Sequence, residues 1–253
     1  MDVKTSPGEK MIVFEKCSYN YSKKTPMETT AIQSLSLQLE PAQLTALMGR
    51  TGSGKTTLAL LAAGLLQPVD GDVCVDGLNT RVKGKHRTIS QKVGLVFQYP
   101  ETQFFCPTVR EEIEFALKNF EIDNPNGYLT LTALKKVGLN ETYMERNPFR
   151  LSGGEQRLVA IASIICWDPD YLFFDEPTAG LDAQSKRHVL SIIRGLEQSG
   201  KGVYVVTHDT KLVKTEAKRL IVLSHGTLRY DGSVKGFFKD PQKMQDTGIF
   251  EPF

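Results

Sequence analysis

The chain has 253 residues, of which 40% are hydrophobic and 24% are charged, as is typical of a soluble globular protein with one large domain or two small ones. Its formal net charge of +2 is too small to indicate a nucleic-acid partner, and we expect none. The four cysteines lie far apart, at positions 17, 74, 106 and 166, which argues against a metal knuckle or a disulfide framework.

The N-terminal region predicts strands. Residues 1–10 are polar, and we expect a tail there instead of a signal peptide. Residues 11–16 and 34–39 alternate apolar and polar side chains as half-buried strands do, and residues 44–48 form a short apolar run typical of another strand. The longest apolar runs are about half the length of a membrane span, so any membrane role should come through a partner.

Residues 49–56, GRTGSGKT, fit the pattern G-x-x-x-x-G-K-[ST] of a phosphate-binding loop. The glycines let successive backbone N–H groups point at one anion, Lys55 can reach the β- and γ-phosphates, and the Thr56 hydroxyl can bind Mg²⁺. An ordinary glycine-rich turn does not account for the strand before the loop and the helix predicted at 57–66, whose dipole would face the phosphates. We therefore predict a nucleoside triphosphate site formed by Gly49, Arg50, Thr51, Gly52, Ser53, Gly54, Lys55, Thr56 and Thr57.

Two further strands are predicted at 72–76 and 93–97. Between them, residues 81–92 form the densest basic stretch of the chain. Because no aromatic residues are interleaved there, we predict a solvated connection and not a nucleic-acid patch.

Helical patterns dominate residues 99–167, with helices predicted at 108–119, 129–137 and 153–167. We interpret this region as a helical lobe inserted into a strand-bearing core. Strands predicted at 171–174, 202–206, 219–223 and 227–230 then alternate with helices at 183–198 and 210–217. The alternation predicts an α/β fold with a largely parallel sheet and helices on both faces.

Three predicted strands end in polar side chains, at the strand ends where open α/β sheets bind ligands. Asp175 suits Mg²⁺, and Glu176 can orient and polarise an attacking water. His208 could donate a hydrogen bond to the γ-phosphate, and the Gln98 amide could contact both metal and water. We assign catalytic roles to Glu176, His208 and Gln98, and metal binding to Thr56, Gln98 and Asp175.

Residues 151–155, LSGGE, begin the helix predicted at 153–167. A serine followed by two glycines at a helix start makes a second anion-binding N-terminus. One chain would then carry two phosphate-binding elements for one nucleotide.

In their order along residues 11–235, these motifs resemble the nucleotide-binding subunit of ATP-binding cassette (ABC) transporters. GRTGSGKT is similar to the Walker A loop, Gln98 to the Q-loop, LSGGE to the signature motif, YLFFDE to the Walker B strand, AGLD with Asp182 to the D-loop, and His208 to the switch histidine. The resemblance implies the P-loop ABC ATPase fold, with a mostly parallel core sheet, an antiparallel β subdomain and an inserted helical lobe. It also implies ATP and Mg²⁺ as ligands.

The resemblance further implies a head-to-tail dimer, in which each ATP lies between the Walker A loop of one subunit and the signature of the other. Ser152 and Gly154 would then serve the ATP of the partner, which can be a second copy or a different ABC ATPase subunit. The resemblance also assigns nucleotide binding to Gly153, Glu155 and Asp182. Tyr21 fits the aromatic residue that stacks on adenine, and Tyr19 is the alternative, since strand residues two apart share a face.

The segment after Gln98, YPETQFF, is similar to ATPases of energy-coupling factor (ECF) transporters. Those systems combine two ATPases with an integral membrane coupling protein and a substrate-capture protein, often for vitamins or transition metals. The resemblance implies an ATPase that powers import at the cytoplasmic face of the membrane. Phe104 and Phe105 fit an apolar contact for the coupling protein, with ordinary core packing as the alternative.

Some features depart from the common family pattern: Glu155 stands where Gln is commoner, and Leu158 and Ser163 replace frequent arginines. The alternative functions are an ATPase of another ABC transporter class and a soluble single-cassette ABC ATPase. We expect one ABC ATPase domain at 11–240, with its core at 11–98 and 168–235 and its helical lobe at 99–167, between tails at 1–10 and 241–253.

Overall fold

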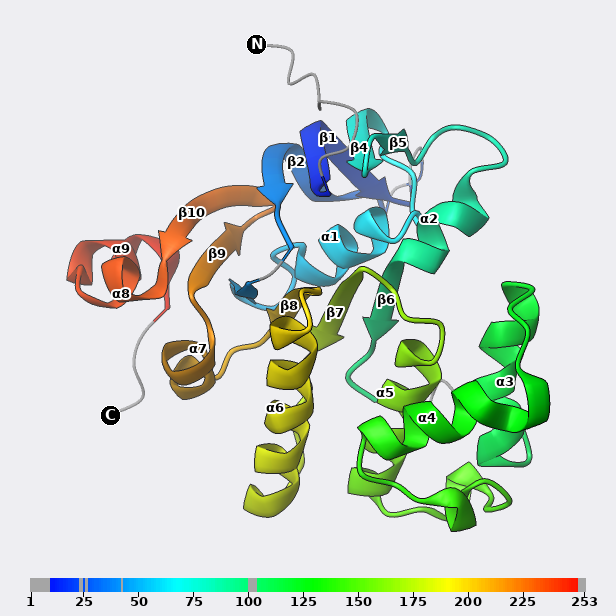
Figure 1. Cartoon of the computed structure of the whole chain (residues 1–253). Helices are drawn as coiled ribbons and strands as arrows, with labels where there is room; N and C mark the ends of the chain where they lie inside the picture. Colours follow the sequence, from blue (N-terminus) through cyan, green and yellow to red (C-terminus); the bar gives the residue numbers. More distant parts are fainter. Residues whose placement is uncertain (1–9, 23–24, 26, 42, 100–103, 250–253) are drawn as a thin grey trace.

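The computed structural model describes residues 10–22, 25, 27–41, 43–99 and 104–249. Its strands form a six-stranded sheet in the order β10-β9-β3-β8-β7-β6 and a four-stranded sheet in the order β2-β1-β4-β5 (Figure 1). The predicted α/β architecture, with a largely parallel core sheet and a separate antiparallel sheet, is confirmed.

The core sheet is parallel except for its last hairpin. Its strands are β3 (Leu44–Met48), β6 (Val93–Val96), β7 (Tyr171–Asp175), β8 (Gly202–Val206), β9 (Arg219–Ser224) and the antiparallel β10 (Thr227–Ser233). Every residue of β3 and β8 is buried, as expected of strands covered on both faces. Because parallel strands end at one edge of a sheet, the loops after β3, β6, β7 and β8 are neighbours.

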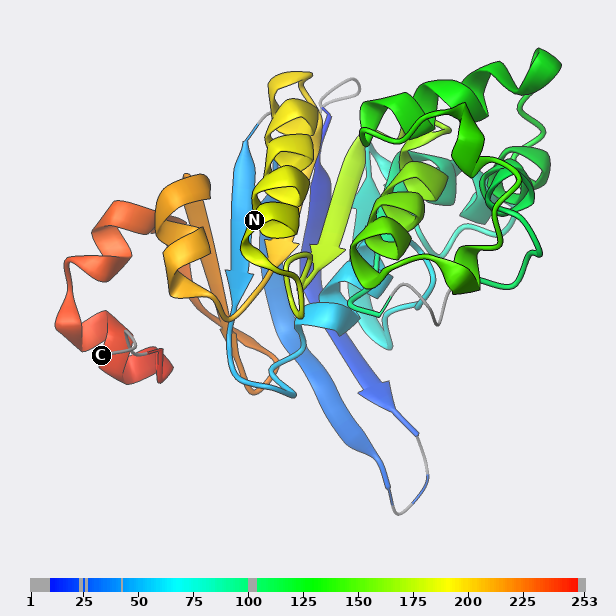
Figure 2. The same cartoon turned by 90° about the horizontal axis from the view of Figure 1, so that it is seen from below.

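The antiparallel sheet contains β1 (Ile12–Tyr21), β2 (Thr29–Leu39), β4 (Asp70–Val75) and β5 (Leu78–Asn79). Strands β1 and β2 extend beyond the predicted ranges, and Figure 2 shows them projecting past the core sheet. Lys16 and Ser34 have positive φ angles of 44° and 43° where the strand register shifts. These irregularities break the alternation of side chains, which is why the sequence pattern ended the strands too early.

Helix α1 (Lys55–Ala62) packs between the two sheets, where Leu58 and Leu61 share one apolar cluster with Phe14 of β1 and Phe173 of β7. Compared with the helix predicted at 57–66, α1 starts two residues earlier and ends four residues earlier. The chain leaves the helical conformation before Gly64, whose φ of 70° is left-handed.

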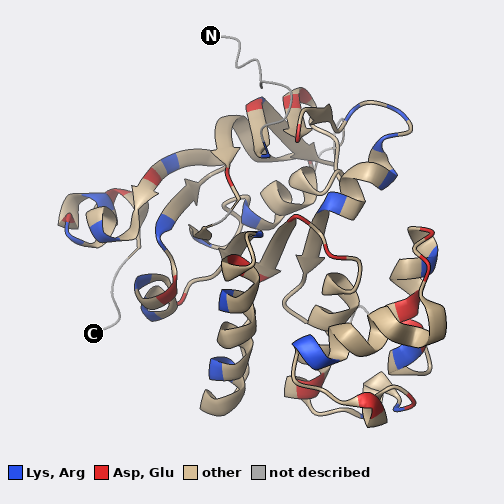
Figure 3. Ribbon diagram, in the orientation of Figure 1, with Lys and Arg blue, Asp and Glu red and all other residues tan. Residues whose placement is uncertain are grey.

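Helix α2 (His86–Lys92) occupies part of the stretch that the sequence predicted as a connection. Ile89 is its one buried residue, so the helix has no apolar stripe from which it could be predicted. Figure 3 shows Lys and Arg positions gathered in the exposed segment leading into α2.

The helical lobe consists mainly of α3 (Val109–Asn119), α4 (Tyr128–Lys136) and α5 (Gly153–Ile165), joined by 3₁₀ turns at Pro125–Gly127, Glu141–Tyr143 and Pro148–Arg150. The three predicted helices are confirmed to within about two residues. Buried residues of the lobe, such as Leu134 and Ile161, belong to the same cluster as Phe174 and Val205 of the core sheet. The lobe is therefore packed onto the core sheet, where α5 also contacts the edge strand β6.

The C-terminal helices are α6 (Ala183–Gln198), α7 (Thr210–Glu216), α8 (Val234–Phe238) and α9 (Pro241–Thr247). The tail predicted from 241 onward is wrong for residues 241–249, because α9 packs there beside β10 (Figure 1). Asp240 caps the helix, Pro241 begins it, and Ile249 is buried in a cluster with Phe237. Within the described ranges, no helix has both the length and the apolar character needed to cross a bilayer.

Candidate nucleotide-binding and catalytic site

The phosphate-binding loop connects β3 to α1, as predicted. Gly49 has a φ of 146°, and a Cβ atom there would lie 2.2 Å from the carbonyl oxygen of Leu223. Gly54, the N-cap of α1, has a φ of 103°, and its Cβ atom would lie 2.5 Å from the carbonyl oxygen of Ala31. Only glycine can occupy either position, so the tight path of the loop is fixed by its neighbours.

The Lys55 side chain folds back over this loop. Its ammonium donates hydrogen bonds to the carbonyl oxygens of Gly49 (2.8 Å) and Arg50 (3.0 Å) and to Oγ of Ser53 (3.3 Å). Burial lowers the pKa of Lys55, while the nearby carboxylates of Asp175 and Glu176 oppose that shift. A phosphate group at this position can accept the hydrogen bonds that the Lys55 ammonium now donates to the loop.

The structure brings together the side chains of Thr56 and Asp175, both predicted to bind Mg²⁺, since the Thr56 hydroxyl donates to Oδ2 of Asp175 at 2.9 Å. Burial raises the pKa of Asp175, Glu176 raises it further, and the Thr56 hydrogen bond and Lys55 oppose the rise. A nearby cation would offset the effect of burial, because it favours the ionised form of Asp175. Among the described residues no cluster of three His, Cys, Asp or Glu could hold a metal.

Glu176 follows Asp175 but faces a different set of partners. Its φ is 45°, and its backbone N–H donates to the Val206 carbonyl at 2.8 Å. One carboxylate oxygen accepts from the Thr207 hydroxyl (3.1 Å), and the other accepts from the His208 backbone N–H (3.0 Å) and Nδ1 (2.7 Å). A non-glycine residue with positive φ that is held by surrounding bonds is typical of a functional position.

The His208 ring is 83% exposed and lies against Glu176. Since a carboxylate can only accept, Nδ1 carries the proton in this contact. The Nε2 atom is then left for a second partner, and it can donate to a phosphate oxygen when the ring is protonated. Gln98 is half-buried just after β6, the strand that pairs with β7, so it lies at the same sheet edge as Asp175.

The signature segment forms the start of α5. Ser152 caps the helix: its side chain accepts from the Glu155 backbone N–H at 3.3 Å, and the Glu155 carboxylate accepts from the Ser152 backbone N–H at 2.8 Å. Asp182 caps α6 in the same way, accepting from the backbone N–H groups of Gln184 and Ser185. A pocket of about 240 Å³ joins these elements, lined among others by Ser152, Gly154, Glu155 and Asp182. Gly153 lies beside them in the first turn of α5.

A separate pocket of about 300 Å³ lies at the phosphate loop. It is lined by Arg50, Thr51, Gly52, Ser53, Ser224 and His225, and it shares no residue with the pocket at the signature. Within the described part of the chain, the two predicted phosphate-binding elements therefore do not share a pocket.

Tyr21 is the better placed of the two aromatic candidates. It is 39% exposed, and its hydroxyl lies 3.2 Å from Oγ1 of Thr57, at the start of α1. Tyr19 meets Tyr21 edge to face at 4.9 Å, but it packs against the apolar cluster beneath the antiparallel sheet. The exposed ring beside the phosphate loop is the one available for stacking.

Three residues near these sites were not predicted. Thr207 binds Glu176, and its position directly before His208 was a usable signal. His225 lies in the turn between β9 and β10, beside the phosphate loop. Tyr143 donates to Glu155 at 2.7 Å, and nothing in its own sequence neighbourhood indicated that contact.

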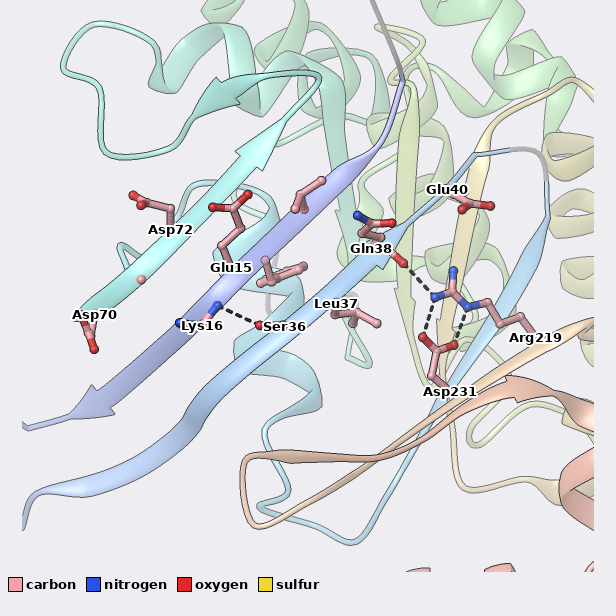
Figure 4. A pocket seen from close by; sticks show the side chains of 13 residues that line it. Glu15, Lys16, Ser36, Leu37, Gln38, Glu40, Asp70, Asp72, Arg219 and Asp231 are labelled. Atoms are coloured by element: carbon pink, nitrogen blue, oxygen red, sulfur yellow. Dashed lines mark hydrogen bonds and ion pairs between the residues drawn. The ribbon is translucent and has the colours of Figure 1, made fainter. Parts of the chain in front are cut away.

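A pocket of about 620 Å³, larger than the two just described, lies elsewhere, between the antiparallel sheet and the β9–β10 strands (Figure 4). Arg219 crosses it to Asp231 with two bonds of 2.7 and 2.8 Å and donates to the Gln38 carbonyl at 2.8 Å. None of the predicted nucleotide-site residues lines it. Size alone therefore does not identify the functional site of this chain.

Three features define an ABC-type ATPase cassette. They are a phosphate loop after a buried parallel strand, two adjacent carboxylates at the end of β7, and an inserted lobe whose LSGGE helix is capped. The sequence pattern of the ABC transporter family matches residues 32–179, and the chain belongs to this family.

Relatives are similar over nearly the whole chain. The energy-coupling factor transporter ATP-binding proteins EcfA2 of Staphylococcus aureus (strain bovine RF122 / ET3-1) and Clostridium perfringens (strain 13 / Type A) are each 38% identical, over 95% of this chain and 86% of theirs. The structure of cbiO1 from Clostridium perfringens, part of the ABC transporter complex cbiONQ, has a TM-score of 0.79 at 25% identity, covering 95% of both chains. The dimeric bacterial ABC transporter cassette MJ0796 has a TM-score of 0.78 at 28% identity, covering 89% of this chain and 100% of that one.

Proposed function

We propose that this chain is the ATP-binding and ATP-hydrolysing subunit that powers import through separate membrane subunits of an ECF-type ABC transporter, for a vitamin or a transition metal. The observation that carries the proposal is the contact of Glu176 with Thr207 and His208, at the sheet edge where Lys55, Thr56 and Asp175 also meet. The names of the similar relatives, ECF transporter ATP-binding proteins, support the transport role.

Hydrolysis of ATP needs a positioned water and stabilised phosphate oxygens. The Glu176 carboxylate, fixed by its two neighbours, accepts a hydrogen bond from the attacking water and polarises it. Lys55 and the backbone N–H groups of Gly52 and Gly54 hold the phosphates, and His208 donates to the γ-phosphate. Thr56, Asp175 and Gln98 would hold Mg²⁺, which supplies positive charge to the β- and γ-phosphate oxygens.

The second half of each site comes from another ABC ATPase subunit. Ser152, Gly153, Gly154, Glu155 and Asp182 belong to a pocket region distinct from that of the phosphate loop, so they are available to a second nucleotide. The dimeric cassette among the similar structures supports pairing. The partner is a second copy of this chain or a related one.

The membrane subunits contact the helical lobe at Phe105. Its ring is 59% exposed and lies edge to face on Phe115 at 4.6 Å, whereas Phe104 is only 6% exposed and packs in the core. The buried Glu112 carboxylate accepts from the backbone N–H groups of Phe105 (3.1 Å) and Cys106 (2.9 Å), which fixes Phe105 in its outward position. Such an exposed aromatic pair suits an apolar helix of the coupling protein, at the cytoplasmic face of the membrane.

The chemistry is tested by Glu176→Gln in the complex purified from native membranes. We expect turnover to fall at least about 100-fold, because the water loses its base, while ATP affinity changes less than about twofold. Glu40→Gln, an exposed glutamate away from the phosphate loop, is the matched control and should keep normal turnover. Hydrolysis near the unmodified rate in Glu176→Gln would contradict the proposal.

The same purification tests the transport role. Recovery of integral membrane proteins with the chain is the expected result. Full ATPase activity in an assembly without any membrane protein would instead favour a soluble single-cassette ATPase.

A further inference from the structure

Both oxygens of the Glu155 carboxylate are engaged at the start of α5. Oε1 accepts a hydrogen bond from the Tyr143 hydroxyl at 2.7 Å. Oε2 accepts from the Ser152 backbone N–H at 2.8 Å and from the Ser152 hydroxyl at 2.7 Å. In the proposed function, Ser152 binds a phosphate of the partner subunit's ATP. In this structure its hydroxyl donates its one proton to Glu155.

Tyr143 is itself held firmly. The Arg146 guanidinium lies 4.0 Å from the centre of its ring, a favourable cation–π distance. The backbone just after Tyr143 pairs with the start of α3: the Arg110 N–H donates to the Met144 carbonyl at 2.9 Å, and the Val109 N–H donates to the Arg146 carbonyl at 3.0 Å. The tyrosine hydroxyl therefore reaches Glu155 from a fixed base and not from a loose loop.

The position of the Glu155 carboxylate matters because its charge lies beside the site of an anion. A carboxylate accepts hydrogen bonds only, so it competes with a phosphate oxygen for the Ser152 proton. Glu155 lines the pocket, so a carboxylate that moved further into it would also repel the phosphate. A glutamine at this position carries no such charge, which makes the restraint specific to a signature that ends in glutamate.

We propose that Tyr143 is a positioning residue for the signature: by holding Oε1 of Glu155 it keeps the carboxylate from following the Ser152 hydroxyl when that hydroxyl turns from Oε2 to the γ-phosphate of the partner subunit's ATP. The inference rests on the proposed role of Ser152. The Tyr143 hydrogen bond and those of Ser152 lower the pKa of Glu155, which keeps the carboxylate ionised at neutral pH. Glu155 in turn raises the pKa of Tyr143, so the tyrosine keeps the proton that it donates.

The test is a double-mutant cycle in the intact membrane complex, with KM for ATP and kcat measured in each variant. Tyr143→Phe keeps the ring over Arg146 and removes only the hydroxyl. We expect it to raise KM for ATP about 3- to 10-fold with less than about a twofold change in kcat. In a Glu155→Gln background the same change should alter KM less than about 1.5-fold, because no charge remains to be restrained.

If Tyr143 only stabilised the fold of the lobe, Tyr143→Phe would change KM equally in the unmodified and Glu155→Gln backgrounds, and that outcome overturns the inference. An unchanged KM in Tyr143→Phe alone also overturns it. Tyr128→Phe, on the same lobe and 66% exposed, is the matched control and should leave KM unchanged.

Ser152→Ala separates this inference from the proposed function. If Ser152→Ala raises KM and Tyr143→Phe does not, only the role of Tyr143 is wrong. If Ser152→Ala changes neither KM nor kcat, the signature does not bind ATP and both proposals fail.

Discussion

Two adjacent carboxylates at the end of β7 acquire different properties from their surroundings. Asp175 is tied to Thr56 and has a pKa raised by burial, whereas Glu176 takes a positive φ and turns to Thr207 and His208. The change of backbone direction between them separates the carboxylate proposed to bind metal from the one proposed to polarise water. Identical side-chain chemistry thus acquires two proposed roles within one peptide unit.

Burial also divides the four cysteines, all of which are free. It raises the pKa of Cys17 and of Cys166 to about 12. Burial also raises the pKa of Cys74 and Cys106, but these two residues are only half-buried and a reagent can reach them. At pH 8 a thiol with a pKa of about 12 is ionised to only about one part in 10⁴, and the thiolate is the reactive form. We expect iodoacetamide to alkylate Cys74 and Cys106 at least about tenfold faster than Cys17 and Cys166.

Peptide mass spectrometry over time measures these rates, and the four should become similar in concentrated urea. Rapid labelling of Cys17 or Cys166 in the folded protein would contradict the packing around them.

Among single residues, the polar side chains that follow strands were predictable, because a buried apolar strand seldom ends in two carboxylates unless they have a function. In the structure the Glu176 carboxylate contacts the His208 ring, although the two residues come from different strand ends. Tyr143 was not predictable, since it reaches Glu155 from a 3₁₀ turn set by the fold of the lobe and not by a motif.

The contact of α5 with β6 depends on a residue without a side chain. A Cβ atom on Gly94 would lie 2.5 Å from Cγ2 of Ile164 and 3.1 Å from Cδ2 of Leu172. Ile164 is β-branched and cannot easily turn aside, so the helix would have to move. The signature at the start of α5 would move with it.

Gly94→Ala should therefore lower the free energy of unfolding by about 1–3 kcal/mol through overpacking. Gly195→Ala is the matched control: it lies in α6, and a Cβ atom there would meet nothing within 4 Å. It should raise the free energy of unfolding by about 0.5–1 kcal/mol, as alanine restricts the unfolded chain and favours helix. Urea denaturation followed by circular dichroism compares the two, and an unchanged midpoint in Gly94→Ala would refute the tight contact.

Elements with a clear apolar period were predictable, and α6 was predicted at its observed bounds. Helices α2 and α9 were not, because each is short and buries one residue. For α9 the cap at Asp240, Pro241 and Gly248 was a readable signal, but its packing on α8 depends on tertiary contacts.

At the scale of the whole molecule, the two predicted phosphate-binding elements line pockets that share no residues, although one cluster of buried side chains joins the lobe to the core sheet. Because that cluster packs the lobe onto the sheet, we propose that the signature binds a nucleotide held by another subunit and not the one at its own phosphate loop. The sequence could predict two phosphate-binding elements in one chain. That they line separate pockets could be seen only in the structure.

The two-subunit site predicts complementation between variants. Glu176→Gln removes the base of one half-site, and Ser152→Ala removes the signature serine of the other, so an assembly uniform in either variant should be nearly inactive. In an assembly with one copy of each, the Ser152→Ala subunit supplies an intact phosphate loop and the Glu176→Gln subunit an intact signature. One of the two sites is then complete, and we expect about half of the unmodified ATPase rate if the sites act independently.

Two affinity tags, one on each variant, select the mixed assemblies. The control pairs Glu176→Gln with Glu176→Ala, a mixture in which neither site can be complete. Mixed assemblies that stay as inactive as this control would refute a site shared between subunits. If no doubly tagged assembly forms, the chain pairs with a different ATPase, and the same cycle applies with the signature change made in that partner. In either case ATPase activity should return only when the two changes lie on different subunits. Only a site built from two chains links the phosphate loop of one to the signature of the other.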